Sequence, residues 1–394
     1  MAKVLVLGVG LQGRAVVHDL MRCPEIGSVV AADVSREQVL ESLAGLVDAR
    51  RGQVEAVAVD ASQEEALTAL LEAERPDVVV CMLPPRLGPR AARLALRSGA
   101  HYVSTSYTGA LSELDVLARE QGLAVLPEMG LDPGLDLVLC RLALDELDEV
   151  HGLEAYGGGI PEPACADDNP LRYKVSWTFE GVLDAYVRTA RRLVDGQEQL
   201  VERTEIFHPS VVSTEEVDGV GTLEAYPNGD ALSYIEAFGL GTGLRDMGRY
   251  SLRWPGHCAF WYPLVQLGLL DEAPTVLCGG VGFPPRKLLA EHLGPRLQFR
   301  ADERDLVVLR VRARGLTSGA RREVVLDVVD FRDLETGFFA MNRTVGYTAS
   351  IGAQMLLSGE IERRGVLSPT RDVPPGPLLE ALETRGIIVT KHAS

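Results

Sequence analysis

The chain has 394 residues, of which 46% are hydrophobic and 24% charged, a composition typical of a soluble globular protein with room for two domains. Its formal net charge of −17 argues against nucleic acid or an anionic membrane surface as a partner, because both are themselves negative. No apolar run reaches the length of a membrane span and the first residues lead directly into a strand pattern, so we expect a cytoplasmic protein without a signal peptide.

The six cysteines are scattered and none forms a C-x-x-C pair, which indicates reduced thiols. No group of histidine, cysteine and carboxylate residues has the spacing of a metal site, so we predict no bound metal. Lysine is rare in this chain, which draws attention to Lys174 in its middle.

The amino-terminal pattern predicts a dinucleotide site. Residues 4–7 form a short apolar run typical of a buried parallel strand. Three glycines follow in the spacing G-x-G-x-x-G, namely Gly8, Gly10 and Gly13. They allow a tight turn, close approach of the backbone to a pyrophosphate, and packing of the next helix on the strand. Asp33 ends the second predicted strand, where a carboxylate accepts a hydrogen bond from the ribose 2′-OH and repels a 2′-phosphate, so we predict NAD rather than NADP.

Strand and helix patterns alternate through the first third of the chain. Further strands are predicted at 28–32, 53–59, 77–81, 101–104 and 123–127, with helices at 14–22, 36–47, 63–73, 89–98 and 112–121. Such repeats predict an α/β fold, a Rossmann doubly wound parallel sheet whose ligand lies beyond the carboxyl ends of its strands. The predicted cofactor contacts are Gly8, Gly10, Leu11, Gln12, Gly13, Asp33, Asp60, Met82, Leu83, Pro84 and Ser106.

The pattern changes near residue 151 to longer, alternating strands. These are predicted at 152–158, 199–207, 231–237, 248–254, 306–314 and 322–331, with helices at 177–193, 258–268, 344–357 and 377–385. We therefore expect an α+β second domain with a mostly antiparallel sheet. We place the NAD-binding Rossmann domain at 1–130 and a substrate-binding and oligomerisation domain at 131–344, with 345–394 packing back on the first. The edges and open face of the second sheet predict a homodimer.

Asp132 and Pro133 follow the sixth predicted strand. They suit an N-cap and the first residue of a helix, a purely structural role. The alternative is that Asp132 contacts cofactor or substrate and acts as a catalytic group.

Residues 169–177 concentrate polar side chains. If the segment is extended, Arg172 and Lys174 lie on one face, where they would repel each other unless an anion lies between them. A substrate carboxylate would serve, with Arg172 and Asn169 binding it. The same crowding would lower the pKa of Lys174 and suit it to general base catalysis. A solvated strand face is the alternative.

Residues 250–257 form the third polar segment. Arg253 offers a planar fork to a carboxylate, and His257 is a candidate proton shuttle at a helix start. An arginine in a salt bridge and a capping histidine are the structural alternatives.

These segments resemble one known family. Gly-Leu-Asp-Pro-Gly at 130–134, Tyr-Gly-Gly-Gly-Ile-Pro at 156–161, Asn-Pro-Leu-Arg-Tyr-Lys-Val-Ser-Trp at 169–177, Leu-Arg-Trp-Pro-Gly-His at 252–257 and the tail 353–366 are similar to the saccharopine dehydrogenase (saccharopine reductase) superfamily. Within it the chain most resembles the NAD-dependent lysine 6-dehydrogenases. The resemblance implies substrate recognition by Arg172 and Arg253.

Our main hypothesis is therefore NAD-dependent oxidative deamination of the side-chain amine of L-lysine or a close relative, giving a semialdehyde that cyclises. Lys174 is the first candidate base, followed by Asp132 and His257. Two alternatives stay open. One is a dehydrogenase or reductase of a secondary amine, such as saccharopine or a carboxylated polyamine. The other is an NAD-binding sensor without catalysis.

Overall fold

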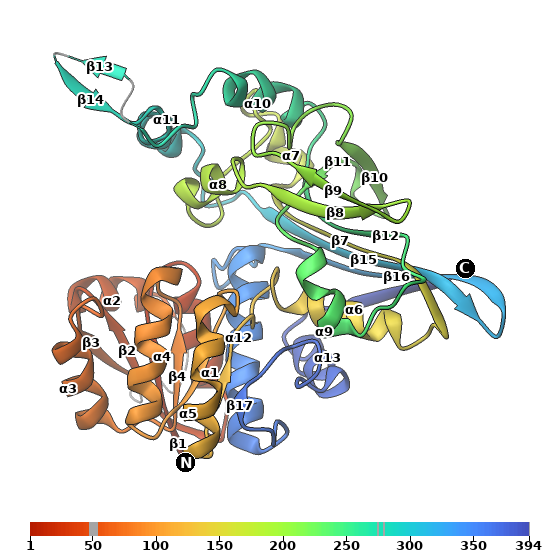
Figure 1. Cartoon of the computed structure of the whole chain (residues 1–394). Helices are drawn as coiled ribbons and strands as arrows, with labels where there is room; N and C mark the ends of the chain where they lie inside the picture. The colour runs from red at the N-terminus through yellow and green to blue at the C-terminus, as the bar shows by residue number, and fades with distance from the viewer. Residues whose placement is uncertain (47–53, 274–275, 279, 394) are drawn as a thin grey trace. The chain divides into compact units, whose positions relative to one another are not determined.

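The computed structural model describes residues 1–46, 54–273, 276–278 and 280–393 (Figure 1). The chain divides into two compact units. Unit 1 comprises Met1–Leu139 and Asn342–Ile388, and unit 2 comprises Cys140–Met341 and Val389–Ser394.

Unit 1 is built on a parallel sheet. Within the described residues its strands follow the order β17-β6-β5-β4-β1-β2-β3, and every neighbouring pair is parallel. The strands are β1 (Ala2–Leu7), β2 (Ile26–Asp33), β3 (Val54–Ala58), β4 (Val78–Cys81), β5 (His101–Ser104), β6 (Ala124–Leu126) and β17 (Gly365–Val366). The central strand β4 is a fully buried apolar run, and residues Val4–Leu7 of its neighbour β1 are buried as well, as expected for a sheet covered on both faces.

Helices alternate with these strands, so the carboxyl ends of the parallel strands lie along one edge of the sheet. They are α1 (Gly13–Arg22), α2 (Arg36–Leu43), α3 (Glu64–Glu74), α4 (Gly88–Arg97), α5 (Asp115–Glu120), α6 (Leu135–Leu144), α12 (Ala340–Ser358) and α13 (Pro375–Glu383), with 3₁₀ turns η2 (Pro85–Leu87) and η3 (Gly109–Leu114). Helices α1 and α12 pack closely, because a Cβ at Gly346 would lie 2.7 Å from the Cβ of Ala15. The predicted Rossmann sheet is confirmed, while the predicted ends at Val47 and Gln53 lie outside the described residues.

Unit 2 holds a larger mixed sheet. Its strands run in the order β10-β11-β12-β7-β15-β16-β18, with β8 paired to β12 and β9 to β8; only β12 and β7 are parallel among the described pairs. They are β7 (Glu149–Pro161), β8 (Ala190–Val194), β9 (Gln197–Val201), β10 (Ser213–Val217), β11 (Gly221–Pro227), β12 (Asp246–Arg253), β15 (Asp305–Thr317), β16 (Ala320–Phe331) and β18 (Val389–Ala393). This confirms the α+β class with a mostly antiparallel sheet.

Short helices and one separate hairpin complete unit 2. They are α7 (Pro163–Ala166), α8 (Phe179–Ala185), α9 (Ile235–Phe238), α10 (His257–Gln266), α11 (Pro285–Leu293), η4 (Leu232–Tyr234), η5 (Gly294–Arg296) and the hairpin β13 (Val276–Cys278) with β14 (Val281–Phe283). An aromatic-rich core, including Tyr186, Phe207, Tyr226 and Trp261, lies among these helices and one side of the sheet.

Three predicted elements of unit 2 are wrong. The helix expected over 177–193 ends at Ala185, and its second half is β8, because Asp195 and Gly196 form the left-handed two-residue turn of a hairpin with β9. The strand expected over 199–207 is β9, which begins at Gln197, directly after that turn, and stops at Val201. The strand expected over 231–237 is instead η4 and α9.

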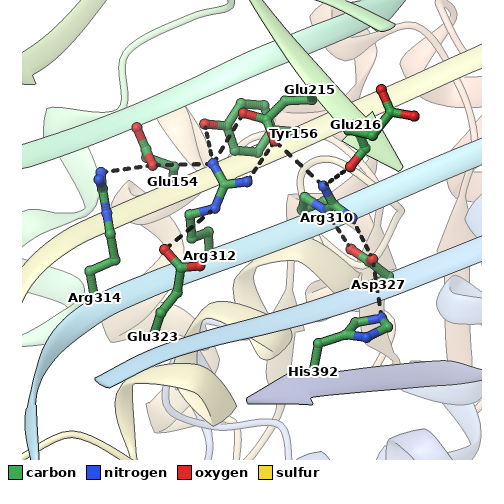
Figure 2. A network of polar contacts seen from close by, with 10 residues as sticks. All are labelled: Glu154, Tyr156, Glu215, Glu216, Arg310, Arg312, Arg314, Glu323, Asp327 and His392. Carbon is green, nitrogen blue, oxygen red and sulfur yellow. Dashed lines mark hydrogen bonds and ion pairs between the residues drawn. The ribbon is translucent and has the colours of Figure 1, made fainter. Parts of the chain in front are cut away.

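Side chains on β15 reach residues of β10, although β11, β12 and β7 lie between these two strands in the order of the sheet (Figure 2). Arg310 on β15 makes a bidentate pair with Asp327, with N···O distances of 2.8 and 2.7 Å, and its Nη1 donates to the carbonyl of Glu216 on β10. Arg312 binds both carboxylate oxygens of Glu215 at 3.0 and 2.6 Å. These buried charges are paired, as burial requires.

The carboxyl-terminal segment is divided between the units. Helices α12, from Asn342 onward, and α13 belong to unit 1. Strand β18 departs from the expectation that all of 345–394 packs on the first domain, because it pairs antiparallel with β16 and extends the sheet of unit 2. No helix in the described part of the chain is long and apolar enough to cross a membrane.

Candidate dinucleotide and carboxylate sites

The glycine turn between β1 and α1 divides its tasks among three glycines. Gly8 has φ +88°, and a Cβ there would lie 3.0 Å from the backbone of Met82. A Cβ at Gly13 would lie 1.9 Å from the carbonyl oxygen of Gly8, so helix and strand touch at this point. A Cβ at Gly10, by contrast, would meet no atom within 4 Å. The fold needs Gly8 and Gly13, whereas Gly10 leaves open space of the kind a pyrophosphate requires.

Asp33 closes this turn at the end of β2. Its Oδ2 accepts a 2.8 Å hydrogen bond from the backbone N–H of Val9, and its Oδ1 accepts one of 2.7 Å from Val34. A negative charge is thereby held beside the glycine turn. The nearest cation along the chain, Arg36, donates its Nε to the carbonyl of Ala56.

The other predicted cofactor contacts lie at the carboxyl ends of the strands of unit 1 or beside the glycine turn. Met82 and the side chain of Leu83 are within 3.3 Å of the Cβ position of Gly8, and Pro84 precedes η2. Leu11 is exposed, and Gln12 accepts a hydrogen bond from Asn342. Asp60 binds the backbone and hydroxyl of Ser62, which lowers the pKa of its exposed carboxylate. The carbonyl of Ser106 accepts from the N–H of Glu128.

Glu128 was missed by the sequence reasoning. It lies directly after β6 with φ +60°, a backbone conformation rare for a side chain of this size. Its buried carboxylate accepts a 3.1 Å hydrogen bond from the N–H of Thr108. Glu128 therefore ties the loop after β5, which contains Ser106, to the end of β6. No spacing in the sequence signals the left-handed conformation.

Asp132 lies in unit 1, within the tight turn formed by residues 130–135. The N–H of Leu135 donates to the carbonyl of Gly130, and a Cβ at Gly134 would lie 2.2 Å from that oxygen. The predicted cap is wrong: α6 begins at Leu135, so Asp132 is not its N-cap and Pro133 is not its first residue. The carboxylate that binds the backbone here is Asp136, which accepts from Gly134 at 2.7 Å.

Lys174 is buried in unit 2 between two carboxylates. Its Nζ lies 2.7 Å from Asp168 Oδ2 and 2.6 Å from Glu303 Oε2, and Arg300 contacts the same two acids. Burial acts to lower the pKa of Lys174, but the hydrogen bonds and charges of Asp168 and Glu303 outweigh it and raise that pKa. The expected lowering is therefore wrong, because the neighbours of Lys174 are anions rather than Arg172.

The segment around Lys174 is irregular rather than an extended strand. Arg172 has φ +47° and pairs with Asp167 at 2.7 Å, with its guanidinium 5.2 Å from the ring centre of Trp254. Asn169 binds its own segment, donating to the carbonyl of Tyr173 and accepting from the N–H of Leu171. Arg172 and Lys174 thus have separate anionic partners.

Arg253 lies in an aromatic box formed with Tyr173, Tyr186 and Tyr226. Its guanidinium carbon is 5.2, 5.9 and 5.9 Å from the three ring centres. The side chain is buried; Nη1 donates to the carbonyl of Leu252 at 2.7 Å, and Nε lies 3.5 Å from the hydroxyl of Tyr186. No carboxylate of the described residues lies within 4.0 Å of it to form an ion pair. A bound anion would stabilise a buried guanidinium of this kind through a charge-assisted pair.

His257 borders the same box. Its Nε2 is 2.7 Å from the hydroxyl of Tyr186, and its ring meets Tyr173 edge-on at 5.8 Å between centres. Burial, and then the charge of Arg253, hold the pKa of His257 well below its usual value, so the imidazole is neutral. Of the six catalytic and substrate-binding residues predicted, Arg253 and His257 both contact the tyrosines of the aromatic box.

The tyrosines of the box could not be found from sequence spacing. Tyr186 follows α8, Tyr226 lies on β11 and Arg253 on β12, so folding alone brings them together. The five cysteines whose side chains the structure describes form no disulfide, and no group of three or more metal-binding side chains occurs among the described residues.

Two family models match the chain. The saccharopine dehydrogenase NADP binding domain matches residues 4–126, and the saccharopine dehydrogenase C-terminal domain matches residues 130–387. The chain belongs to the saccharopine dehydrogenase family. The superfamily resemblance seen in the sequence is thereby confirmed, while the lysine branch stays a prediction.

Individual relatives cover the whole chain. The bovine mitochondrial alpha-aminoadipic semialdehyde synthase is 30% identical over all of this saccharopine dehydrogenase family member, which spans about half (48%) of that relative's length. The Saccharomyces cerevisiae saccharopine dehydrogenase [NADP(+), L-glutamate-forming] is 25% identical over 99% of this chain and 98% of its own. The solved apo structure of the L-Glu forming enzyme from that yeast superimposes with a TM-score of 0.86 at 23% identity, covering both chains fully, which shows the shared fold.

Proposed function

We propose that this chain is an NAD-dependent dehydrogenase that oxidises a carbon–nitrogen bond of a carboxylate-bearing amino acid. The observation that carries the proposal is the aromatic box of Arg253, a buried cation without an ion-pair partner among the described residues. A substrate carboxylate would complete it with a charge-assisted, bidentate pair. The membership of the family of saccharopine dehydrogenases supports the reaction class.

The residues of unit 1 fit a dinucleotide. The open space beside Gly10 and the N–H groups at the start of α1 would hold the pyrophosphate, and Asp33 the adenine ribose. When bound, the nicotinamide supplies hydride acceptance. The charge of Asp33 supports NAD over NADP, in contrast with the cofactor named for the yeast relative. This preference is the part of the proposal most directly open to test.

The substrate we favour is saccharopine or a similar secondary amine between two amino-acid arms. Relatives named saccharopine dehydrogenase align along nearly the full length of this chain, which supports this substrate class. The second candidate is oxidation of the side-chain amine of L-lysine. It is favoured by Asp33, because the lysine enzymes that the sequence resembles use NAD.

A general base must accept a proton from the substrate amine before hydride leaves. Lys174 is charged between Asp168 and Glu303, which weakens the case for it. Asp132 stays a candidate. His257 is neutral and lies beside Arg253, so it too stays a candidate, but the burial and the charge that lower its pKa make it a weak base, and its Nε2 already contacts the hydroxyl of Tyr186.

The test measures NADH and NADPH formation by the purified chain with saccharopine and with L-lysine. We expect turnover of saccharopine with NAD⁺, and an Arg253→Ala variant whose KM for saccharopine rises at least about 30-fold while its affinity for NADH stays unchanged. Turnover of L-lysine alone, with release of ammonia, favours the second candidate. Tight NAD⁺ binding without turnover of either amine indicates a sensor and overturns the proposal. A homodimer remains a prediction, checked by the mass in solution.

A further inference from the structure

Glu224 lies opposite Arg253 in the sheet of unit 2. Strands β11 and β12 are antiparallel, and Glu224 pairs directly with Arg253, as Tyr226 pairs with Ser251. Directly paired residues in an antiparallel sheet point to the same face, and so do residues two apart on a strand. Glu224 therefore projects from the face that carries Arg253 and Tyr226. An acid opposite an arginine ordinarily forms a cross-strand ion pair.

The carboxylate of Glu224 is engaged elsewhere. Its Oε1 accepts a 2.8 Å hydrogen bond from the N–H of Gly256, and its Oε2 accepts one of 2.9 Å from Cys258. Both amides belong to the amino end of α10, where Gly256 has φ +95° and supplies no side-chain cap. Glu224 thus provides the cap that the helix itself lacks, and a carboxylate is the favoured group at that end.

Two consequences meet at the aromatic box. The two amides that Glu224 binds lie on either side of His257, the first residue of α10, and Arg253 ends β12 three residues before Gly256. Its carboxylate, bound to two amides, forms no ion pair with the guanidinium opposite, which keeps Arg253 open to another anion. The side chain of Glu224 therefore holds the start of α10 around His257 and forms no ion pair with Arg253.

We propose that Glu224 is a positioning residue for substrate binding: by capping α10 it fixes His257 and leaves the guanidinium of Arg253 available to the carboxylate of the substrate. This inference rests on the proposed role of Arg253 as a carboxylate anchor. It concerns how Arg253 is kept able to bind a carboxylate, and it assigns Glu224 no contact with the reacting atoms.

The experiment measures binding without turnover. Glutarate, a dicarboxylate without an amine, is titrated into the full chain with saturating NAD⁺, and the signal is tryptophan fluorescence. Trp261 is suited to report, since its ring centre is 5.0 Å from that of Tyr186. We expect Glu224→Ala to raise the Kd of glutarate about 5- to 10-fold, the scale of a lost helix cap. Glu224→Gln, which keeps one acceptor oxygen, should fall between this variant and the parent.

A matched control removes an exposed acid of the same unit, Glu202→Ala, and should leave the Kd unchanged. Where saccharopine is turned over, Glu224→Ala should raise its KM, because Arg253 and His257 are no longer held in place, a change that general loss of stability does not produce. Thermal melts establish that each variant is folded. If Glu224→Ala does not fold, Glu224→Gln decides the matter.

The outcomes separate the two proposals. An Arg253→Ala variant that binds glutarate as the parent does overturns the carboxylate anchor itself. If Arg253→Ala loses binding but both Glu224 variants bind normally, the anchor stands and the positioning role is wrong. Tighter binding in both Glu224 variants would mean that the acid acts by repelling the anion, and this also overturns the inference.

Discussion

Lys174 Nζ lies 2.6 Å from Glu303 Oε2 in a part of unit 2 where both side chains are buried, and this contact reverses the expected behaviour of the lysine. Two carboxylates surround it, so the charged form is the stable one. Since its pKa in the folded chain lies above the ordinary value of 10.5, the stabilisation is complete below that pH and is lost only as the pH rises through the folded pKa.

Replacing Lys174 should therefore damage stability more than chemistry. We expect Lys174→Met to lower the free energy of unfolding by about 3 kcal/mol between pH 6 and 9, because it takes a cation away from the buried carboxylate of Glu303. Lys174→Arg should fold and keep kcat within about threefold. Urea unfolding and steady-state kinetics check both, with the exposed Lys287→Met as the control. A hundredfold loss of kcat in a stable Lys174→Arg would restore the lysine as the base.

The charge of Asp33 should set the choice of dinucleotide. Asp33→Asn keeps an oxygen acceptor near Val9 or Val34 but removes the negative charge that opposes a 2′-phosphate. We expect the ratio of kcat/KM with NAD⁺ to that with NADP⁺ to fall at least about tenfold, because like charges at close range cost several kcal/mol. An unchanged ratio, or a parent that already prefers NADP⁺, would remove the basis for assigning NAD.

An added methyl group should weaken dinucleotide binding at Gly10 and lower the stability of the fold at Gly13. Gly13→Ala places a Cβ against the carbonyl of Gly8, so we expect a loss of about 3 kcal/mol or more in stability. Gly10→Ala meets no protein atom and should melt within a degree or two of the parent. Its affinity for NADH should nevertheless fall at least about tenfold, since the methyl group enters the space assigned to the pyrophosphate. Isothermal titration separates the two effects, and normal NADH binding by Gly10→Ala would place the phosphates elsewhere.

Asp305 should make stability depend on pH near neutrality. Burial raises the pKa of its carboxyl to about 7, despite hydrogen bonds from the amides of Ala340 and Met341 at the start of α12. An acid with a raised folded pKa stabilises the chain below its unfolded pKa of 3.8 and loses that contribution as the pH rises to about 7.

The predicted result is a free energy of unfolding that declines less steeply between pH 4 and 7 in Asp305→Asn than in the parent. Urea titrations at four pH values measure it, with the exposed Asp302→Asn as the comparison. Parallel curves for parent and Asp305→Asn would show that Asp305 does not titrate in this range.

Local patterns were sufficient for most of unit 1. Six of its strands are short, mainly apolar runs followed by a turn signal, and the three glycines have the spacing of a dinucleotide-binding turn; the two-residue strand β17 was not predicted, because it is defined only by its pairing with β6. Unit 2 was harder, since β8 and β9 are short and their hairpin depends on the left-handed pair Asp195 and Gly196. A helix was expected across β8. Where a segment's pattern fits both a helix and a strand, pairing with a neighbouring strand decides its secondary structure.

For the candidate site in unit 2 as well, some features were predictable from the sequence and others depended on folding. The types of residue at 253 and 257 and their closeness along the chain were enough to suggest a carboxylate and a proton carrier, because guanidinium and imidazole chemistry do not depend on the fold. The partners of these residues depended on folding. Three tyrosines from separate segments surround Arg253, two acids keep Lys174 in its charged form, and Glu224 caps the amino end of α10. A pKa and the availability of a charge follow from burial and neighbours, and those are properties of the packed chain rather than of its local sequence.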